Sequence, residues 1–136
     1  MNIIIHRGTH QIGGSAIEIS TASTRIILDF GNELSLDEKY IPVNLDIDGV
    51  TKGMPDCDGI VISHYHIDHL GQLTSALPEI PLYMGELSKE IALIGAEYQD
   101  RDLYLRLLGA NTFRGGEAFS IGDIRIRPLV IDHSAA

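Results

Sequence analysis

Residues 59 to 71, which read G-I-V-I-S-H-Y-H-I-D-H-L-G, decide the fold. Residues 59 to 62 form a continuous apolar run, and together with Ser63 they predict a short strand that is buried on both faces. Three histidines and an aspartate follow within the next six positions. Helical spacing is then kept by Leu70, Leu73, Thr74 and Leu77 until Pro78 intervenes. The segment therefore predicts a buried strand that leads, through several possible metal ligands, into a helix.

The histidines and the aspartate have a spacing that suits metal binding. His64 and His66 are two positions apart as the chain leaves the strand, and in an extended backbone such side chains point the same way. Both imidazoles can therefore bind one ion. Asp68 and His69 follow where the chain turns into a helix, which directs them toward a neighbouring position. The pattern favours two adjacent metal sites, and the mixed imidazole and carboxylate ligands favour zinc, with manganese or iron as alternatives.

A surface loop that happens to be rich in histidine is the alternative interpretation of this cluster. The cluster lies at a junction between a strand and a helix, where binding sites are expected, and this position favours the metal site.

The remaining pattern mixes strands with helices. Strands are expected at residues 3–5, 15–19, 24–29 and 81–84, and glycines mark a turn after the first of them. A helix is expected from Glu86 to about Leu108, ended by Gly109. Its apolar stripe consists of Leu87, Ile91, Ile94 and Tyr98, followed by Leu105 and Leu108. Apolar residues that alternate on both sides of Gly122 and Asp123 predict a hairpin. The fold class is therefore α/β, with a mixed sheet and flanking helices.

Length and composition indicate one soluble domain. The 136 residues suit a single core, and no apolar run approaches the ~18 residues that cross a membrane. The first residues lack the features of a signal peptide, and the single cysteine, Cys57, cannot form an internal disulfide, so a cytoplasmic location is expected. The net charge of −9 argues against a free-standing nucleic-acid-binding module. It does not exclude a hydrolase whose substrate is held by metal ions or by another domain.

The stretch from His64 to Gly71 resembles the H-x-H-x-D-H signature of the metallo-β-lactamase-fold hydrolases, which holds a dinuclear metal centre. G-T-H-Q-I-G-G-S-A-I-E-I from Gly8 and R-I-I-L-D-F-G from Arg25 are similar to the start of its RNA-processing branch, which includes ribonuclease J and the β-CASP nucleases. The resemblance implies that Asp29 supports the ligands from outside the coordination sphere. It also makes His133, in V-I-D-H-S, the third imidazole beside His64 and His66.

The same resemblance assigns roles to the remaining polar residues. Asp68 and His69 become ligands of the second ion, and Asp68 is also the candidate catalytic residue. The glycine-rich turn lies near the metal site in the family, so His10 is a weak candidate for the rim of that site. Asp132 and Ser134 flank His133. They can orient it, or they can be ordinary loop residues, and the sequence favours neither alternative.

The chain matches only the first half of the family's αβ/βα sandwich, so we expect residues 1–136 to be one truncated domain. The bridging aspartate and the last histidine of the second site belong to the other half, and full activity of this chain alone is therefore not expected. The sheet face that packs against that half should be exposed and apolar. We expect a homodimer, or a missing C-terminal half, to cover it.

The resemblance implies a hydrolase that uses one or two zinc ions and a metal-bound hydroxide, with RNA or another phosphodiester as the expected substrate. A small-molecule metallohydrolase acting on lactones, thioesters or β-lactams is the first alternative. A non-catalytic metal-binding or dimerising module is the second.

Overall fold

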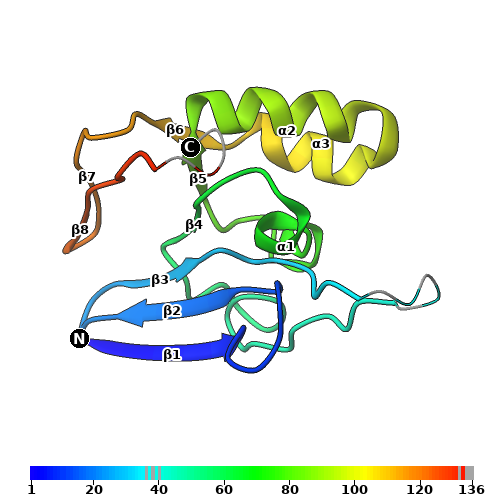
Figure 1. Cartoon of the computed structure of the whole chain (residues 1–136). Helices are drawn as coiled ribbons and strands as arrows, with labels where there is room; N and C mark the ends of the chain where they lie inside the picture. Colours follow the sequence, from blue (N-terminus) through cyan, green and yellow to red (C-terminus); the bar gives the residue numbers. More distant parts are fainter. Residues whose placement is uncertain (36, 38, 40, 132, 134–136) are drawn as a thin grey trace.

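The computed structural model describes residues 1–35, 37, 39, 41–131 and 133. Within these residues, six strands form one mixed sheet in the order β1-β2-β3-β4-β5-β6 (Figure 1). The first three strands pair antiparallel, and β3 to β6 pair parallel. The strands are β1 (Asn2–Arg7), β2 (Ala16–Ser20), β3 (Arg25–Leu28), β4 (Gly59–Ile62), β5 (Leu82–Gly85) and β6 (Asn111–Phe113). The predicted α/β class and its mixed sheet are confirmed. The short, polar strand β6 was not expected.

Strand β4 is the centre of the core, as its apolar sequence predicts. All four of its residues are buried, and its side chains alternate between two apolar clusters. Ile60 and Ile62 pack in the larger cluster on the helical side of the sheet. Val61 packs in the smaller cluster on the other side, with Ile26 and Ile121. Strand β4 ends at Ile62, and the chain leaves it through the exposed Ser63 directly into the histidine cluster.

The helix after the histidine cluster is shorter than predicted. Helix α1 (Ile67–Leu70) ends at Gly71, and the chain continues as the short 3-10 helix η1 (Leu73–Ser75). Gly71 has no room for a side chain, since a Cβ there would lie 2.5 Å from both the Asn32 Nδ2 and the Ile67 carbonyl oxygen. Glycine is therefore needed for the close packing behind the cluster.

The prediction of a single helix from Glu86 to about Leu108 is wrong, because two helices occupy this range. Helix α2 (Glu86–Gln99) ends at Asp100, whose φ of −148° is extended, and α3 (Arg101–Leu108) follows. The Asp100 side chain accepts hydrogen bonds from the backbone N–H groups of Asp102 and Leu103, so it caps the second helix.

The apolar stripe that predicted α2 is not its buried side. Leu87, Ile94 and Tyr98 are 53%, 66% and 84% exposed, whereas Ser88 and Ala96 are buried. Small side chains let the helix lie close to its neighbours. In α3, Leu103 and Leu107 are buried, while the predicted Leu105 and Leu108 are about half exposed.

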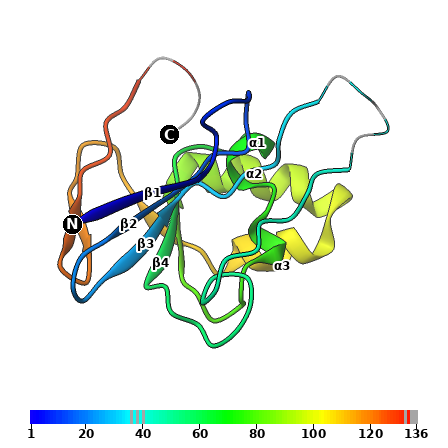
Figure 2. The ribbon, with the colours of Figure 1, turned by 90° about the horizontal axis from the view of Figure 1, so that it is seen from below.

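The predicted hairpin is confirmed as β7 (Phe119–Ile121) and β8 (Ile124–Ile126), which pair antiparallel around Gly122. Figure 2 shows the sheet between this hairpin and the helices. Phe119, Ile121 and Ile126 belong to the small apolar cluster on the sheet face opposite the helices. The expectation that this face is exposed is therefore wrong over the part that the hairpin covers. Apolar exposure remains on β1, where Ile3 and Ile5 are 61% and 51% exposed.

Among the described residues, no helix has the length and apolar character needed to cross a membrane.

Candidate metal centre

The site begins where two adjacent parallel strands end. Strands β3 and β4 pair in parallel, with Leu28 opposite Val61, so their carboxyl ends meet at one edge of the sheet. Asp29 follows β3, and Ser63 and His64 follow β4. Asp29 has a φ of 57°, in the left-handed region that only a few non-glycine residues adopt. This conformation turns the chain sharply at the point where the polar side chains gather.

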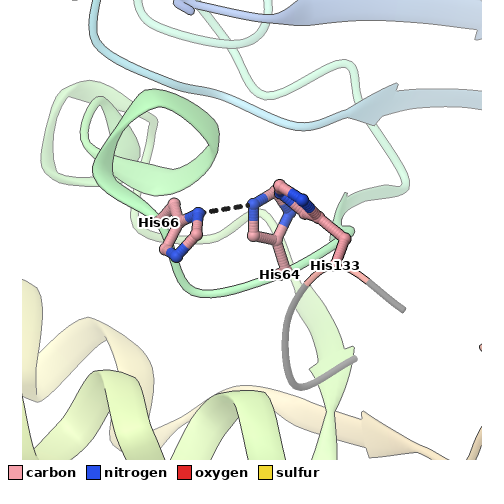
Figure 3. A group of neighbouring side chains, drawn as sticks. All are labelled: His64, His66 and His133. Carbon is pink, nitrogen blue, oxygen red and sulfur yellow. Dashed lines mark hydrogen bonds between the residues drawn. The ribbon is translucent and has the colours of Figure 1, made fainter. Parts of the chain in front are cut away.

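Three histidines converge beside this edge (Figure 3). One ligand atom from each of His64, His66 and His133 lies within 4.8 Å of the other two. His64 Nε2 and His66 Nδ1 are 3.0 Å apart, and the ring centroid of His133 lies 5.0 Å from that of His64 and 5.7 Å from that of His66. His64 is buried, His66 is half-buried and His133 is exposed. The group therefore opens to solvent on the His133 side.

This donor set fits a zinc ion. Nitrogens bound at ~2.0–2.1 Å to one tetrahedral ion lie roughly 3.3 Å from one another. The 3.0 Å separation between His64 Nε2 and His66 Nδ1 is close to that spacing, and rotation of the exposed His133 ring can bring its nitrogen nearer. One of the two close nitrogens must carry a hydrogen for them to hydrogen bond, and an ion would replace that proton.

Asp68 and His69 form a second pair next to the three histidines. His69 Nε2 lies 3.4 Å from Asp68 Oδ2, and the ring centroid of His69 is 4.1 Å from that of His64. The other nitrogen of His69, Nδ1, lies 2.7 Å from Asp29 Oδ2. His69 therefore presents Nε2 and Asp68 presents a carboxylate oxygen at a position adjacent to the first group. That arrangement matches the two neighbouring positions expected from the spacing of the motif.

Asp29 makes three contacts that organise the edge of the site. Its Oδ1 accepts a 2.7 Å hydrogen bond from the Ser63 backbone N–H. Its Oδ2 accepts a 3.0 Å hydrogen bond from the Ser63 hydroxyl and also contacts His69. Asp29 lies outside the group of three histidines and touches a residue of the second pair. This is the supporting position that the sequence resemblance implies for it.

The environments of His64 and His69 shift the pKa values of the two rings in opposite directions. Burial lowers the pKa of His64, and the neighbouring His69 and His66 lower it further. The hydrogen bond with Asp29 raises the pKa of His69, and this effect outweighs the opposing effect of burial. A low pKa keeps His64 neutral, which is the form that binds metal, while the carboxylate holds the proton of His69 on Nδ1.

The glycine-rich loop after β1 packs against the backbone of the motif and is hydrogen-bonded to it. The N–H groups of Gly14 and Ser15 lie 3.1 and 3.3 Å from the Asp68 carbonyl oxygen and donate to it. A Cβ on Gly13, whose φ is 76°, would lie 2.8 Å from the Asp68 Cβ. The loop therefore needs glycine to approach this closely. His10, the weak candidate for the site rim, is exposed, and Asp132 and Ser134 fall outside the described residues.

Two residues that support the site were missed in the sequence. Arg7 is buried and donates hydrogen bonds to the carbonyl oxygens of Gly14, Gly31 and Val43, so it ties the glycine loop to the segment after β3. A lone arginine at the end of an apolar strand, directly before a glycine, was the available signal. Ser63 marks only the end of the apolar run in the sequence, but its hydroxyl contacts Asp29 and His64.

Comparison with known proteins gives the chain its relatives, although no family model matches it. It is 33% identical over 94 residues to a probable ribonuclease, RNase MJ4, of Methanocaldococcus jannaschii, a match that covers 67% of this chain and 20% of that protein. It is 28% identical over 145 aligned positions to ribonuclease J of Helicobacter pylori, covering 94% of this chain and 20% of that protein. The chain thus spans about a fifth of the length of these curated relatives.

A solved structure shares the fold. A protein of unknown function from Enterococcus faecalis V583 superposes with a TM-score of 0.72 at 20% identity, covering 90% of this chain and 36% of that one. The sequence matches are to proteins named as ribonucleases, among them ribonuclease J, and they agree with the resemblance to the RNA-processing branch of the metallo-β-lactamase-fold hydrolases that the motif from His64 to Gly71 carries.

Proposed function

We propose that the chain carries the metal-binding part of a metal-dependent phosphodiesterase that cleaves RNA or a related nucleic acid. One observation carries the proposal: ligand atoms of His64, His66 and His133 lie within 4.8 Å of one another, although His133 is far from the others in sequence. The names of the relatives, which are ribonucleases, support the substrate class.

Each side chain of the site has a distinct task in this proposal. His64, His66 and His133 hold the first ion, for which zinc is the best fit. Asp68 and His69 hold a second ion or, in its absence, accept a hydrogen bond or a proton at Asp68 Oδ2. A bound divalent ion would supply Lewis-acid chemistry, lowering the pKa of water and polarising a phosphoryl oxygen. Asp68 remains the candidate catalytic residue, and Asp29 orients His69.

The substrate would be held by the metal ions and not by a basic surface. The net charge is −9, and a chain of this charge does not attract a phosphate backbone by itself. A phosphodiester can nevertheless bind through its oxygens to the ions. This requirement makes binding of RNA depend on metal loading, which separates the proposal from a general nucleic-acid-binding role.

A small-molecule metallohydrolase is the second candidate, and a cavity beside the site favours it. A cleft of about 280 Å³ opens next to Asp29 and Ser63 and is otherwise lined by apolar side chains, among them Leu28, Phe113 and Ile126. Such a cleft suits an acyl chain better than a nucleotide phosphate. The two candidates share the metal site and differ in the group that occupies this cleft.

The expected partner and location also stand as proposals. The exposed isoleucines Ile3 and Ile5 on the edge strand β1 support a homodimer or a covering C-terminal half. The lone, partly buried Cys57 suits a reducing compartment such as the cytoplasm.

Zinc titration followed by activity assays tests the proposal. Calorimetry of the chain should show one or two zinc ions bound, and His66→Ala should lower the affinity of the first site at least 10-fold, because one of its three imidazoles is lost. Full activity is not expected of this chain alone, but the residual hydrolysis by the zinc-loaded chain should be faster on a phosphodiester such as an RNA oligonucleotide than on an acyl ester. Preference for the acyl ester would favour the second candidate. Unchanged zinc binding by the His66→Ala chain would contradict both candidates.

A further inference from the structure

The hydroxyl of Ser63 lies between the two halves of the metal centre. Its Oγ is 3.0 Å from Asp29 Oδ2, 3.0 Å from His64 Nδ1 and 3.4 Å from His69 Nδ1. It therefore touches one histidine from each of the two proposed metal positions, together with the carboxylate that supports them. The roles given above to the ligands do not use this hydroxyl.

The direction of each hydrogen bond follows from counting hydrogens. A carboxylate has no hydrogen to give, so the single hydrogen of the Ser63 hydroxyl must point to Asp29 Oδ2. The hydroxyl oxygen is then an acceptor toward His64, and His64 must carry its hydrogen on Nδ1. This leaves the lone pair of His64 on Nε2, the atom that lies 3.0 Å from His66 Nδ1 inside the group of three histidines.

The Asp29 carboxylate fixes the tautomer of His69 by direct contact, with no hydroxyl between them. Asp29 Oδ2 lies 2.7 Å from His69 Nδ1, which therefore carries the hydrogen and leaves Nε2 free, 3.4 Å from Asp68 Oδ2. His64 and His69 thus present the same nitrogen, Nε2, to the two adjacent positions. The Ser63 hydroxyl, which contacts both Asp29 Oδ2 and His64 Nδ1, connects the carboxylate to the first ring by hydrogen bonds.

We propose that Ser63 is a positioning residue that relays the Asp29 carboxylate to His64, so that one carboxylate fixes the tautomer of one histidine in each metal position. The inference rests on the proposed function, because it concerns the same metal centre. It adds that a single carboxylate, Asp29, acts on both metal positions: directly on His69 and through Ser63 on His64. A change at Ser63 should therefore disturb the first position and leave the Asp29–His69 contact of the second in place.

Substitution of Ser63 separates this role from a purely structural one. Ser63→Ala removes the hydroxyl but keeps the backbone N–H that donates to Asp29 Oδ1. Ser63→Thr keeps the hydroxyl and is the conservative rescue variant. Ser120→Ala, at an exposed position of the hairpin strand β7, is the matched control. Loss of groups that orient metal-binding histidines costs roughly 10–100-fold in metal affinity, and the solvent exposure of Ser63 points to the lower end, since water can partly replace the hydroxyl.

Two measurements on the whole chain then decide the matter. In metal-free protein at about pH 8, nitrogen-15 NMR of the imidazoles should find the His64 hydrogen on Nδ1, and Ser63→Ala should shift the population toward Nε2. Zinc calorimetry should show roughly 10-fold weaker binding at the first site for Ser63→Ala, with Ser63→Thr and Ser120→Ala within about 3-fold of the unmodified chain.

Each other outcome overturns a specific claim. A His64 hydrogen on Nε2 in the unmodified, metal-free chain contradicts the relay and leaves the proposed function intact. Equal zinc affinity of the Ser63→Ala and unmodified chains does the same. A failure of Ser63→Thr to restore affinity also counts against the hydroxyl. If the unmodified chain binds no zinc, the proposed function itself fails and the relay fails with it.

Discussion

His69 Nδ1 lies 2.7 Å from Asp29 Oδ2, although the two residues are 40 positions apart in the chain. The contact joins the residue after β3 to helix α1, which follows β4, and the parallel pairing of β3 and β4 brings these two segments to one edge of the sheet. The candidate metal-binding residues are therefore brought together by the same strand pairing that builds the core. Stability and metal binding should respond together when this contact is changed.

The Asp29–His69 contact should make stability depend on pH. The folded chain holds the pKa of His69 above its ordinary value through the hydrogen bond with Asp29. Its contribution is fully present below the unfolded pKa of ~6.5 and is lost as the pH rises through the raised folded value. Asp29→Asn removes the charge, and asparagine tolerates the left-handed φ of 57° at this position.

Urea unfolding of the metal-free chain checks this dependence. The free energy of unfolding of the unmodified chain should exceed that of Asp29→Asn most clearly near pH 6, and the difference should shrink toward pH 8 to 9. Use of the difference between two chains cancels the contributions of the other histidines. A difference that grows with rising pH would show that the assigned ion pair does not form.

Gly31 should be intolerant of any side chain. A Cβ at Gly31 would lie 1.7 Å from the Asp68 carbonyl oxygen and 2.5 Å from the His69 backbone nitrogen. Gly31→Ala must therefore push the segment after β3 away from the metal-binding turn, and we expect it to cost about 1–3 kcal/mol of unfolding free energy or more. It should also weaken zinc binding, because Asp68 and His69 move with their backbone.

Gly95 provides the matched control for this substitution. It lies inside α2, and a Cβ there meets nothing within 4 Å. Gly95→Ala should stabilise the chain by up to ~1 kcal/mol, since alanine favours a helix interior over glycine. Chemical denaturation of both variants measures the contrast. Equal stability of Gly31→Ala and the unmodified chain would mean that the two loops do not pack as described.

Two substitutions, one on the exposed side of α2 and one on its buried side, test which side of the helix packs against the core. Ile94 is 66% exposed, so Ile94→Gln should change the free energy of unfolding by no more than about 0.5 kcal/mol. Ala96 is 4% exposed in the main cluster, so Ala96→Leu should cost about 1–3 kcal/mol through overpacking. Thermal unfolding of both variants is sufficient. If Ile94→Gln cost more unfolding free energy than Ala96→Leu, the apolar stripe would lie against the core, contrary to the structure.

Glu18 should contribute to stability only when it is ionised. Burial raises the pKa of Glu18, but hydrogen bonds with Arg25 and His6 at 2.8 and 3.0 Å outweigh that effect and hold the pKa below its usual value. The contribution is present above the unfolded pKa and is lost as the pH falls through the lowered folded value. Glu18→Gln should therefore be less stable than the unmodified chain at pH 7, and the two unfolding curves should converge on acidification. Curves that stay parallel down to pH 3 would refute the ion pair.

The elements with a strong local pattern were predictable from the sequence. Strand β4 follows from four consecutive buried positions, and the hairpin follows from alternation around Gly122. The gathering of the four polar side chains of the motif was predictable because His64 and His66 leave a strand and Asp68 and His69 enter a helix, while the second ion stays a prediction. In each case the information lies within a few neighbouring residues.

The errors arose where a distant contact decides the outcome. The apolar stripe of Leu87, Ile94 and Tyr98 has helical spacing, but spacing does not say which side of the helix meets the sheet. The break at Asp100 depends on its side chain capping α3, which is an alternative to a continuous helix that periodicity does not distinguish. The role of Ser63 depends on Asp29, 34 positions away.

A crystal structure of the zinc-loaded chain, with the ion located by its anomalous scattering, tests the central claim most directly. The account predicts an anomalous peak at ~2.0–2.1 Å from one ring nitrogen of each of His64, His66 and His133. A zinc ion bound elsewhere, or three rings turned apart into solvent with no ion between them, would contradict it.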